Sequence, residues 1–143
     1  MKSEVVALDR VRFAERRLRH HSQAKRKKLA CSMERHSQLV PIVIDAEGMV
    51  IDGRARVEVA RELGWTTIVA VRVEHLTSED LRLFAIAANK FVEDAAWDLS
   101  ELRVELDEIE TALPTIDLTL SGFSNPEIDT LRGAHRAAEL NDL

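Results

Sequence analysis

Four short apolar segments, rich in β-branched residues and bounded by polar or turn residues, predict β-strands. They lie at residues 5–8, 41–45, 49–52 and 66–73. The last is β-branched almost throughout, which is typical of a central strand. The second and third are joined by a turn at Glu47-Gly48. A helix separates the third from the fourth, and such a connection forms a right-handed crossover, so we expect part of the sheet to be parallel.

Apolar residues at helical spacing predict five helices. They lie at residues 23–37, at 53–63, from about 78 to 92, from about 99 to just before Pro114, and from residues 125–127 onward. Ser22 is expected to cap the first helix, and Asp98 or Ser100 the fourth, because these side chains accept hydrogen bonds from backbone amides of the first turn. Gly64 is expected to end the second helix in the left-handed region.

The first helix is expected to turn an apolar stripe toward the core, made by Ala24, Leu29, Ala30 and Met33. Cys31 lies beside this stripe, so a buried and unreactive thiol is expected rather than a nucleophile. The second helix is expected to face inward with Val57, Ala60 and Leu63.

These elements predict an α/β (α+β) fold, with a small mixed sheet, packed helices and a helical C-terminal part. The length of 143 residues fits one domain. We expect an α/β core at residues 1–96, a helical extension of the same domain at 97–134, and a disordered tail at 135–143.

Composition narrows the class of protein. Hydrophobic residues make up 45% and aromatic residues 4%, which predicts an aliphatic core. No apolar run approaches the roughly 18 residues of a membrane span, and the N-terminus has no apolar region typical of a secretion signal. The one cysteine cannot form an internal disulfide. We therefore expect a cytoplasmic protein with no membrane partner.

Charge is distributed unevenly along the chain. Residues 1–40 carry 11 Lys and Arg against 4 Asp and Glu, a net of +7, and the remaining residues carry 9 against 21, a net of −12. Such a basic segment is the electrostatic pattern of a nucleic-acid or polyphosphate site. The alternative is a solvated helix face that balances the acidic half. The candidate DNA-binding residues are Arg16, Arg17, Lys25, Arg26, Lys27 and Lys28.

The sequence Asp-Gly-Arg-Ala-Arg at residues 52–56 stands where a predicted strand changes into a helix. Glycine allows close approach of the backbone, helix N-terminal amides attract anions, and two arginines flank the opening. This combination predicts an anion site, and phosphate is the expected anion. Asp52 is expected to orient an arginine, to bind a metal, or to be an ordinary strand-end carboxylate.

Several motifs, in this order and spacing, resemble the N-terminal domain of ParB-type partition proteins. They are RHHS at 19–22, ACSM at 30–33, PIVID at 41–45, GRAR at 53–56, LG at 63–64 and ANK at 88–90. Residues 89–106 and Gly122-Phe123 resemble more closely the ParB-like domains found in phages and beside DNA methyltransferases. The resemblance spans residues 5–132.

The resemblance implies the fold shared by ParB and sulfiredoxin, with a nucleoside triphosphate, CTP or ATP with Mg²⁺, bound at the Gly-x-x-Arg loop. Gly53 and Arg56 would contact phosphates, and Arg54 and Ala55 would supply loop amides. The positions that match the family's other phosphate-facing or metal-facing residues are Arg19, His21 and Asn89, the last also being the candidate Mg²⁺ ligand.

The chain also departs from the family. The catalytic Glu that partition ParB carries before the Asn is replaced by Ala88, which argues against hydrolysis. Sulfiredoxin needs a cysteine in the loop, and the absence of one excludes its reductase chemistry. Because the chain ends soon after this domain, we expect neither the helix-turn-helix domain nor the dimerisation domain of partition ParB, and hence no centromere-specific binding.

Three functions follow as hypotheses. The first is a stand-alone ParB-like domain that binds a nucleoside triphosphate, a DNA backbone, or both, in partition, phage or DNA-modification processes, as a monomer or homodimer. The second is a metal-dependent nuclease or an NTP-hydrolysing or phosphotransfer enzyme, with Glu93, Asp52 and Glu58 as the candidate carboxylates. The third is an adaptor that docks a partner such as a DNA methyltransferase or a phage packaging protein.

Overall fold

The structure is a computed structural model that describes residues 1–141, with side chains described as far as Gly133. The chain divides into two compact units, Met1–Asp94 and a second that begins at Ala95. The sequence led us to place the boundary between core and extension after residue 96. Within the described residues, no helix is long and apolar enough to cross a membrane.

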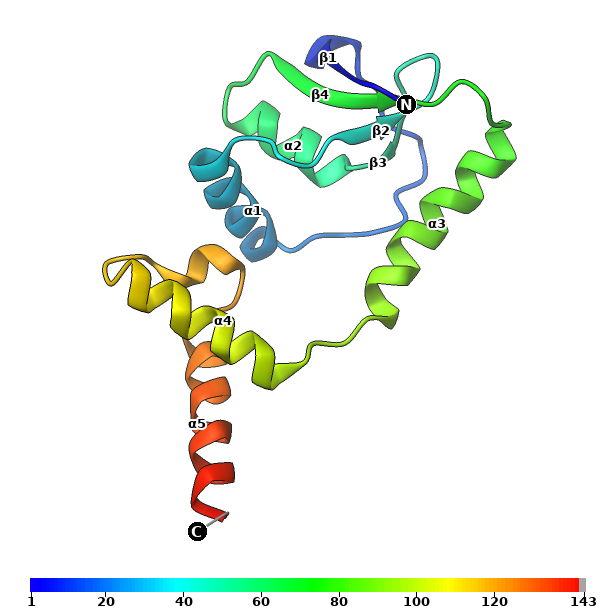
Figure 1. Ribbon diagram of the computed structural model, residues 1–143. Coiled ribbons are helices and arrows are strands. Elements are labelled where there is room, and N and C mark those ends of the chain that lie inside the picture. Colours follow the sequence, from blue (N-terminus) through cyan, green and yellow to red (C-terminus); the bar gives the residue numbers. More distant parts are fainter. Residues whose placement is uncertain (142–143) are drawn as a thin grey trace. The chain divides into compact units, whose positions relative to one another are not determined.

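A four-stranded mixed sheet forms the centre of the first unit (Figure 1). Its strand order is β1-β4-β2-β3, with β4 paired to β2 in parallel and to β1 antiparallel, and β2 paired to β3 antiparallel. The strands are β1 (Ser3–Ala7), β2 (Ile42–Ile44), β3 (Val50–Asp52) and β4 (Thr67–Arg72). The prediction that part of the sheet is parallel and the interior position of the fourth strand are therefore confirmed. The parallel pair is β2 and β4, whereas β3 and β4, which the helix connects, are not neighbours in the sheet.

The turn between β2 and β3 is organised by Asp45. Its carboxylate accepts hydrogen bonds from the backbone amides of Glu47 and Met49, both at 2.9 Å. Gly48 follows with a φ of 86°, and a Cβ there would lie 2.6 Å from the Arg10 carbonyl oxygen. This turn brings β3 back along β2, so that the chain enters the next helix at the edge of the sheet.

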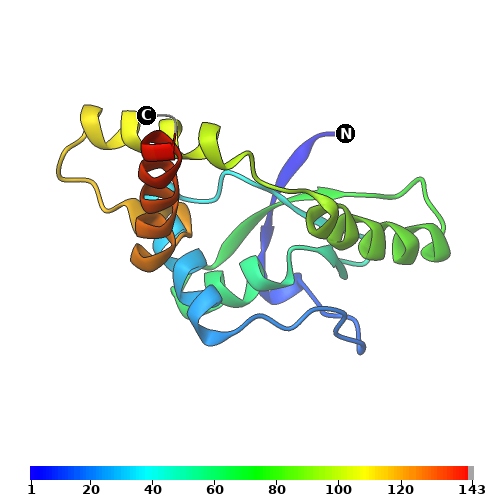
Figure 2. The same cartoon turned by 90° about the horizontal axis from the view of Figure 1, so that it is seen from below.

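Three α-helices belong to the first unit: α1 (Gln23–His36), α2 (Arg54–Glu62) and α3 (Ser78–Asp94). A short 3₁₀ helix, η1 (Leu8–Arg10), follows β1. Helix α1 packs on α2, α2 contacts β2, and α3 lies beside β3. Figures 1 and 2 both show α1 and α2 as neighbours, with α3 at the other end of the sheet.

The core between the sheet and the first two helices is aliphatic, as predicted. Its buried members are Val6, Leu8, Val11, Met33, Ile42, Ile44, Val57, Val59, Ala60, Ile68 and Ala70. Two expectations for α1 were wrong, because Ala24 and Cys31 are exposed. Helix α1 buries Met33 fully and Leu29 and Ala30 partly, so its inward stripe is narrower than the spacing of apolar residues suggested.

The second unit contains α4 (Leu99–Ala112), the 3₁₀ helix η2 (Leu118–Ser121) and α5 (Asn125–Asn141). Of the two caps proposed for α4, Asp98 is the one used, accepting from the Glu101 amide at 3.1 Å. Trp97 and Phe123 meet edge to face, with ring centroids 5.3 Å apart. We expected a disordered tail at 135–143; α5 extends to Asn141, and the last two residues lie outside the described chain.

Candidate anion-binding site

Gly53 stands at the N-terminus of α2, where the sequence predicted a phosphate loop. It caps the helix with φ 109° and ψ 21°, in the left-handed region. A Cβ added there would lie 2.5 Å from Cγ2 of Ile42 on the neighbouring strand. The glycine is therefore required by the packing of the fold itself, whether or not a ligand approaches the loop.

The two loop arginines point to different neighbours. The guanidinium of Arg54 lies over the ring of Phe13, 4.3 Å from its centroid, and donates to the carbonyl oxygen of Ala14 at 3.5 Å. Arg56 instead donates to the carbonyl oxygen of Pro41 at 3.2 Å and pairs with Asp52 at 3.6 Å. Arg54 thus contacts the segment that contains Phe13 and Ala14, whereas Arg56 contacts the residue that precedes β2.

The N-terminal arm, which we define as residues 12–22, is anchored to the sheet and to α2. Arg12 bridges to Met49, with the Arg12 amide donating to Gly48 and the Val50 amide donating to Arg12, at 3.0 and 2.8 Å. The ring of Phe13 lies between two guanidiniums, that of Arg54 and that of Arg61, the latter 5.1 Å from its centroid. The first part of this irregular segment is therefore fixed to β3 and α2 by hydrogen bonds and ring contacts.

The carboxylate of Glu58 forms ion pairs with three arginines. Arg17 of the arm donates to it at 2.9 Å, and Arg26 of α1 and Arg54 of α2 pair with it at 3.6 Å. Sequence reasoning treated Glu58 as a candidate catalytic carboxylate. Only its spacing of four from Arg54 could have indicated an ion pair, because the other two partners are distant in sequence.

The remaining positions matched to the family lie on the arm and on α3. Arg19 donates to Glu93 at 2.9 Å, which connects the arm to the last turn of α3, and Glu93 also pairs with Lys90 at 3.7 Å. The side-chain amide of Asn89 donates to the Ala85 carbonyl oxygen of its own helix at 2.8 Å. Arg19 and Glu93 are thus brought together.

His21 is the second of the two histidines of the arm, and its pKa reflects the electrostatic field of this region. Burial lowers the pKa of His21 below its ordinary value of 6.5, and the neighbouring charges of Arg19, Lys25 and Arg17 lower it further, against a smaller opposite effect of Glu58. The cationic side chains therefore outweigh the carboxylate at this point. A net positive field of this kind attracts anions.

The basic residues of α1 differ in whether they form ion pairs. Arg26 also pairs with Glu62, whereas Lys25, Lys27 and Lys28 and the arm's Arg16 are exposed. Among the described residues, the buried Nε atoms of Arg26, Arg54 and Arg56 have no hydrogen-bond partner. The Nε of Arg54 lies 3.6 Å from the Glu58 carboxylate, as part of their ion pair, and the Nε atoms of Arg26 and Arg56 are buried from solvent.

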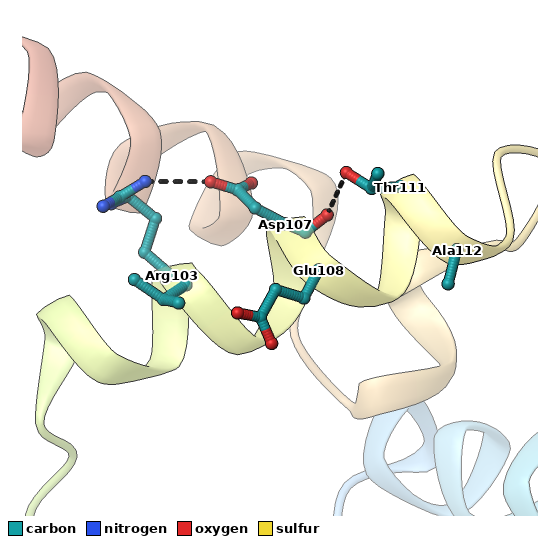
Figure 3. Close-up of a pocket in the computed structure, with 6 residues that line it drawn as sticks. Arg103, Asp107, Glu108, Thr111 and Ala112 are labelled. Carbon is teal, nitrogen blue, oxygen red and sulfur yellow. Dashed lines mark hydrogen bonds and ion pairs between the residues drawn. The ribbon is translucent and has the colours of Figure 1, made fainter.

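Two hollows of the described structure are lined by residues outside the arginine cluster around Glu58. One of about 400 Å³ lies on α4 and is lined by Arg103, Val104, Asp107, Glu108, Thr111 and Ala112 (Figure 3). Another, of about 150 Å³, is apolar and lies between the sheet and the start of α3. No group of three His, Cys, Asp or Glu side chains positioned to hold a metal ion occurs among the described residues.

No protein-family model and no curated protein matches the chain. Solved structures do. The C-terminally truncated partitioning protein ParB of Caulobacter crescentus, complexed with CTP-γ-S, superimposes with a TM-score of 0.75 at 16% identity, over 92% of this chain and 77% of that one. The same protein complexed to the centromeric parS site gives a TM-score of 0.53 at 15% identity, over 90% and 70%.

Sulfiredoxin from Arabidopsis thaliana gives a TM-score of 0.50 at 27% identity, over 57% of this chain and 94% of that one. A Pnob8-like ParB N-domain gives 0.51 at 20% identity, over 80% and 47%. These matches agree with the mixed sheet and with the order of helices described above. The chain therefore has the ParB/sulfiredoxin-like fold.

Proposed function

We propose that this ParB-like domain binds a nucleoside triphosphate at the N-terminus of α2. One observation carries the proposal: guanidiniums from three elements, those of Arg17, Arg26 and Arg54, converge there on a single carboxylate. The lowering of the His21 pKa, first by burial and then by Arg19, Lys25 and Arg17, agrees with a positive field in this region. The Caulobacter ParB of the same fold is complexed with CTP-γ-S, so CTP is the first ligand to test and ATP the second.

The residues present suit the chemistry of a triphosphate. Guanidiniums form bidentate, charge-assisted hydrogen bonds to phosphate oxygens. The first backbone hydrogen bond of α2 is donated by Val57 to Gly53, so the amides of Arg54, Ala55 and Arg56 precede it and can donate to an anion. Arg19 and His21 would contact the phosphates from the arm. Ligand phosphates would neutralise the positive charge of the arginines and thereby order the arm. The bound and free proteins would then differ in the order of the arm, as in a conformational switch.

Asn89 is the residue proposed to reach Mg²⁺. Its amide nitrogen is engaged with Ala85, which leaves the side-chain oxygen as a ligand of the kind that Mg²⁺ takes together with phosphate oxygens and water. A bound Mg²⁺ would offset phosphate charge. The role of Arg56 as a phosphate ligand stays a prediction, since its guanidinium contacts Pro41 and Asp52.

Titration calorimetry with CTP, ATP and inorganic triphosphate, each with and without Mg²⁺, tests the proposal. Arg17→Gln and Arg54→Gln each remove one charged donor, and we expect each to weaken binding roughly 10- to 100-fold. Arg35→Gln removes the same charge at the other end of α1 and should bind like wild type. Equal affinities of all four proteins, or no binding by wild type, would refute the proposal.

A second function, contact with a DNA backbone, is favoured by the exposed Lys25, Lys27 and Lys28 on α1. Phosphate contacts release counterions, so binding should fall steeply with salt. A Lys27→Gln/Lys28→Gln variant keeps Lys25, whose charge acts on His21. It should lose most duplex binding in fluorescence anisotropy at low salt and keep wild-type affinity for CTP. Retention of duplex binding by this variant would exclude α1 as the DNA surface.

The enzymatic and adaptor functions remain predictions. The candidate catalytic carboxylates Glu93 and Asp52 are both ion-paired, the first with Arg19 and the second with Arg56. A phage or DNA-modification context and a methyltransferase or packaging partner rest on sequence resemblance.

A further inference from the structure

Glu58 joins three parts of the first unit through one carboxylate. Its partners are Arg17 on the arm, Arg26 on α1 and Arg54 at the start of α2. These residues are separated in sequence and are brought together by the packing of α1 on α2. One negative charge therefore faces three positive ones.

The carboxylate lies deeper than the arginines around it. The Glu58 side chain is 16% exposed, against 25% for Arg17, 27% for Arg26 and 32% for Arg54. Each guanidinium carries five N–H donors. Arg17, for example, uses Nη2 toward Glu58 and Nε toward the Arg19 carbonyl oxygen, so further donors remain. An anion arriving from solvent would meet these donors first and need not displace the carboxylate.

We propose that Glu58 is a positioning residue that holds the arm, α1 and the loop arginine together as one cationic surface, with ligand phosphates bound on its outer side. Without the Glu58 charge, three guanidiniums would be left close together with no shared counter-ion, and their repulsion would release the arm. The ligand half of this inference rests on the proposed function. The arm-holding half stands without a ligand.

Limited trypsin digestion of the full chain, followed by mass spectrometry, tests the arm-holding half. The measured quantity is the rate of cleavage after Arg16, Arg17 and Arg19. We expect Glu58→Gln to raise this rate at least about fivefold. Glu62→Gln is the matched control, because Glu62 lies one turn later on α2, is 56% exposed and pairs with Arg26; its arm should be cleaved at the wild-type rate.

Glu58→Asp separates charge from packing. Glutamine is closer to glutamate in size, whereas aspartate keeps the charge on a side chain that is one methylene shorter. If Glu58 acts through its charge, the arm of the Asp variant should be better protected than that of the Gln variant. The reverse order would mean that Glu58 fills space, and would overturn the proposal. Far-UV circular dichroism verifies that each variant is folded at the digestion temperature.

Affinity for CTP or inorganic triphosphate tests the ligand half. A positioning residue predicts about tenfold weaker binding in Glu58→Gln, and binding at or slightly above wild-type strength in Glu62→Gln. A carboxylate that competed with phosphate would give the opposite result, tighter binding in Glu58→Gln, and that outcome would overturn the proposal. If wild type binds no triphosphate, the proposed function fails, and the cleavage rates still decide whether Glu58 holds the arm.

Discussion

Gly53 illustrates how a single residue can be fixed by backbone geometry and by a neighbour at once. Its φ is 109°, and a Cβ would approach Ile42 to 2.5 Å. We expect Gly53→Ala to lower the free energy of unfolding by roughly 2–4 kcal/mol, from backbone strain plus overpacking. Urea unfolding followed by circular dichroism measures this loss.

Gly64 provides the control for that substitution. Its φ is 78°, and a Cβ there would meet nothing within 4 Å. Gly64→Ala should therefore cost only the strain of the left-handed region, about 1–2 kcal/mol. If the two variants lose equal stability, contact with Ile42 contributes nothing and the packing explanation is wrong.

His21 gives a prediction for pH. Its pKa in the folded state is lowered, first by burial and then by Arg19, Lys25 and Arg17. As pH falls through about 6.5, the unfolded chain takes up a proton at His21 while the folded chain does not, so stability falls with pH below this value. His21→Gln should flatten this part of the profile relative to wild type. Parallel urea titrations from pH 7.5 to 5.5 measure it, and superimposable slopes would contradict the assignment.

Single residues were predictable where their role is local. Ser22, Gly64 and Asp98 act on the backbone within three or four positions, so the sequence alone identified them. The role of Glu58 as an ion-pair partner of three arginines was not predictable, because two of these arginines lie on the arm and on α1, far from Glu58 in the sequence. Cys31 was misplaced for the same reason: whether a helix position is covered depends on the neighbour across from it, which a sequence pattern does not contain.

The helix α1 is stabilised by a side-chain cap at its N-terminus. The hydroxyl oxygen of Ser22 accepts from the Lys25 amide at 3.1 Å. We expect Ser22→Ala to destabilise the protein by about 1 kcal/mol. Ser22→Asp keeps an acceptor and adds a negative charge at the helix N-terminus, so it should melt at or above the wild-type temperature. Equal melting temperatures for all three proteins would show that the cap does not contribute.

Apart from the end of α5, strand and α-helix positions followed from the sequence within one to three residues, because apolar periodicity and turn residues are local signals. The start of β1 was missed, since Ser3 and Glu4 are polar and lie on the edge strand. The contacts that fix the arm were missed as well. Phe13 is held between Arg54 and Arg61, and both partners lie far along the chain.

At the scale of the whole molecule, the two units differ in how much core they contain. The main core cluster lies entirely in the first unit, whereas the buried hydrophobic side chains described in the second are Leu106 and Ile128. Each unit also contains one tryptophan: Trp65 packs against the core, and Trp97 is 66% exposed. Tryptophan fluorescence can therefore follow the two units separately.

We expect the second unit to unfold at a lower urea concentration, because its described side chains bury less apolar surface than those of the first unit. Trp97→Phe leaves Trp65 as the reporter of the first unit, and Trp65→Phe leaves Trp97 as the reporter of the second. Circular dichroism of both variants corrects for any change in overall stability. Coincident transitions from both reporters would instead indicate one cooperative unit.

The bridge between Arg12 and Met49 affects the free energy of ordering the arm on ligand binding and the rate of that binding. The arm begins at this bridge and ends where α1 starts at Gln23, so it is a short loop closed at both ends and not a free tail. A closed loop has less conformational entropy to lose than a free tail of the same length. Ordering of the arm by an anion would therefore cost less free energy than ordering of a free tail. The rate of ligand capture would then be limited by diffusion and electrostatic steering more than by folding of the arm.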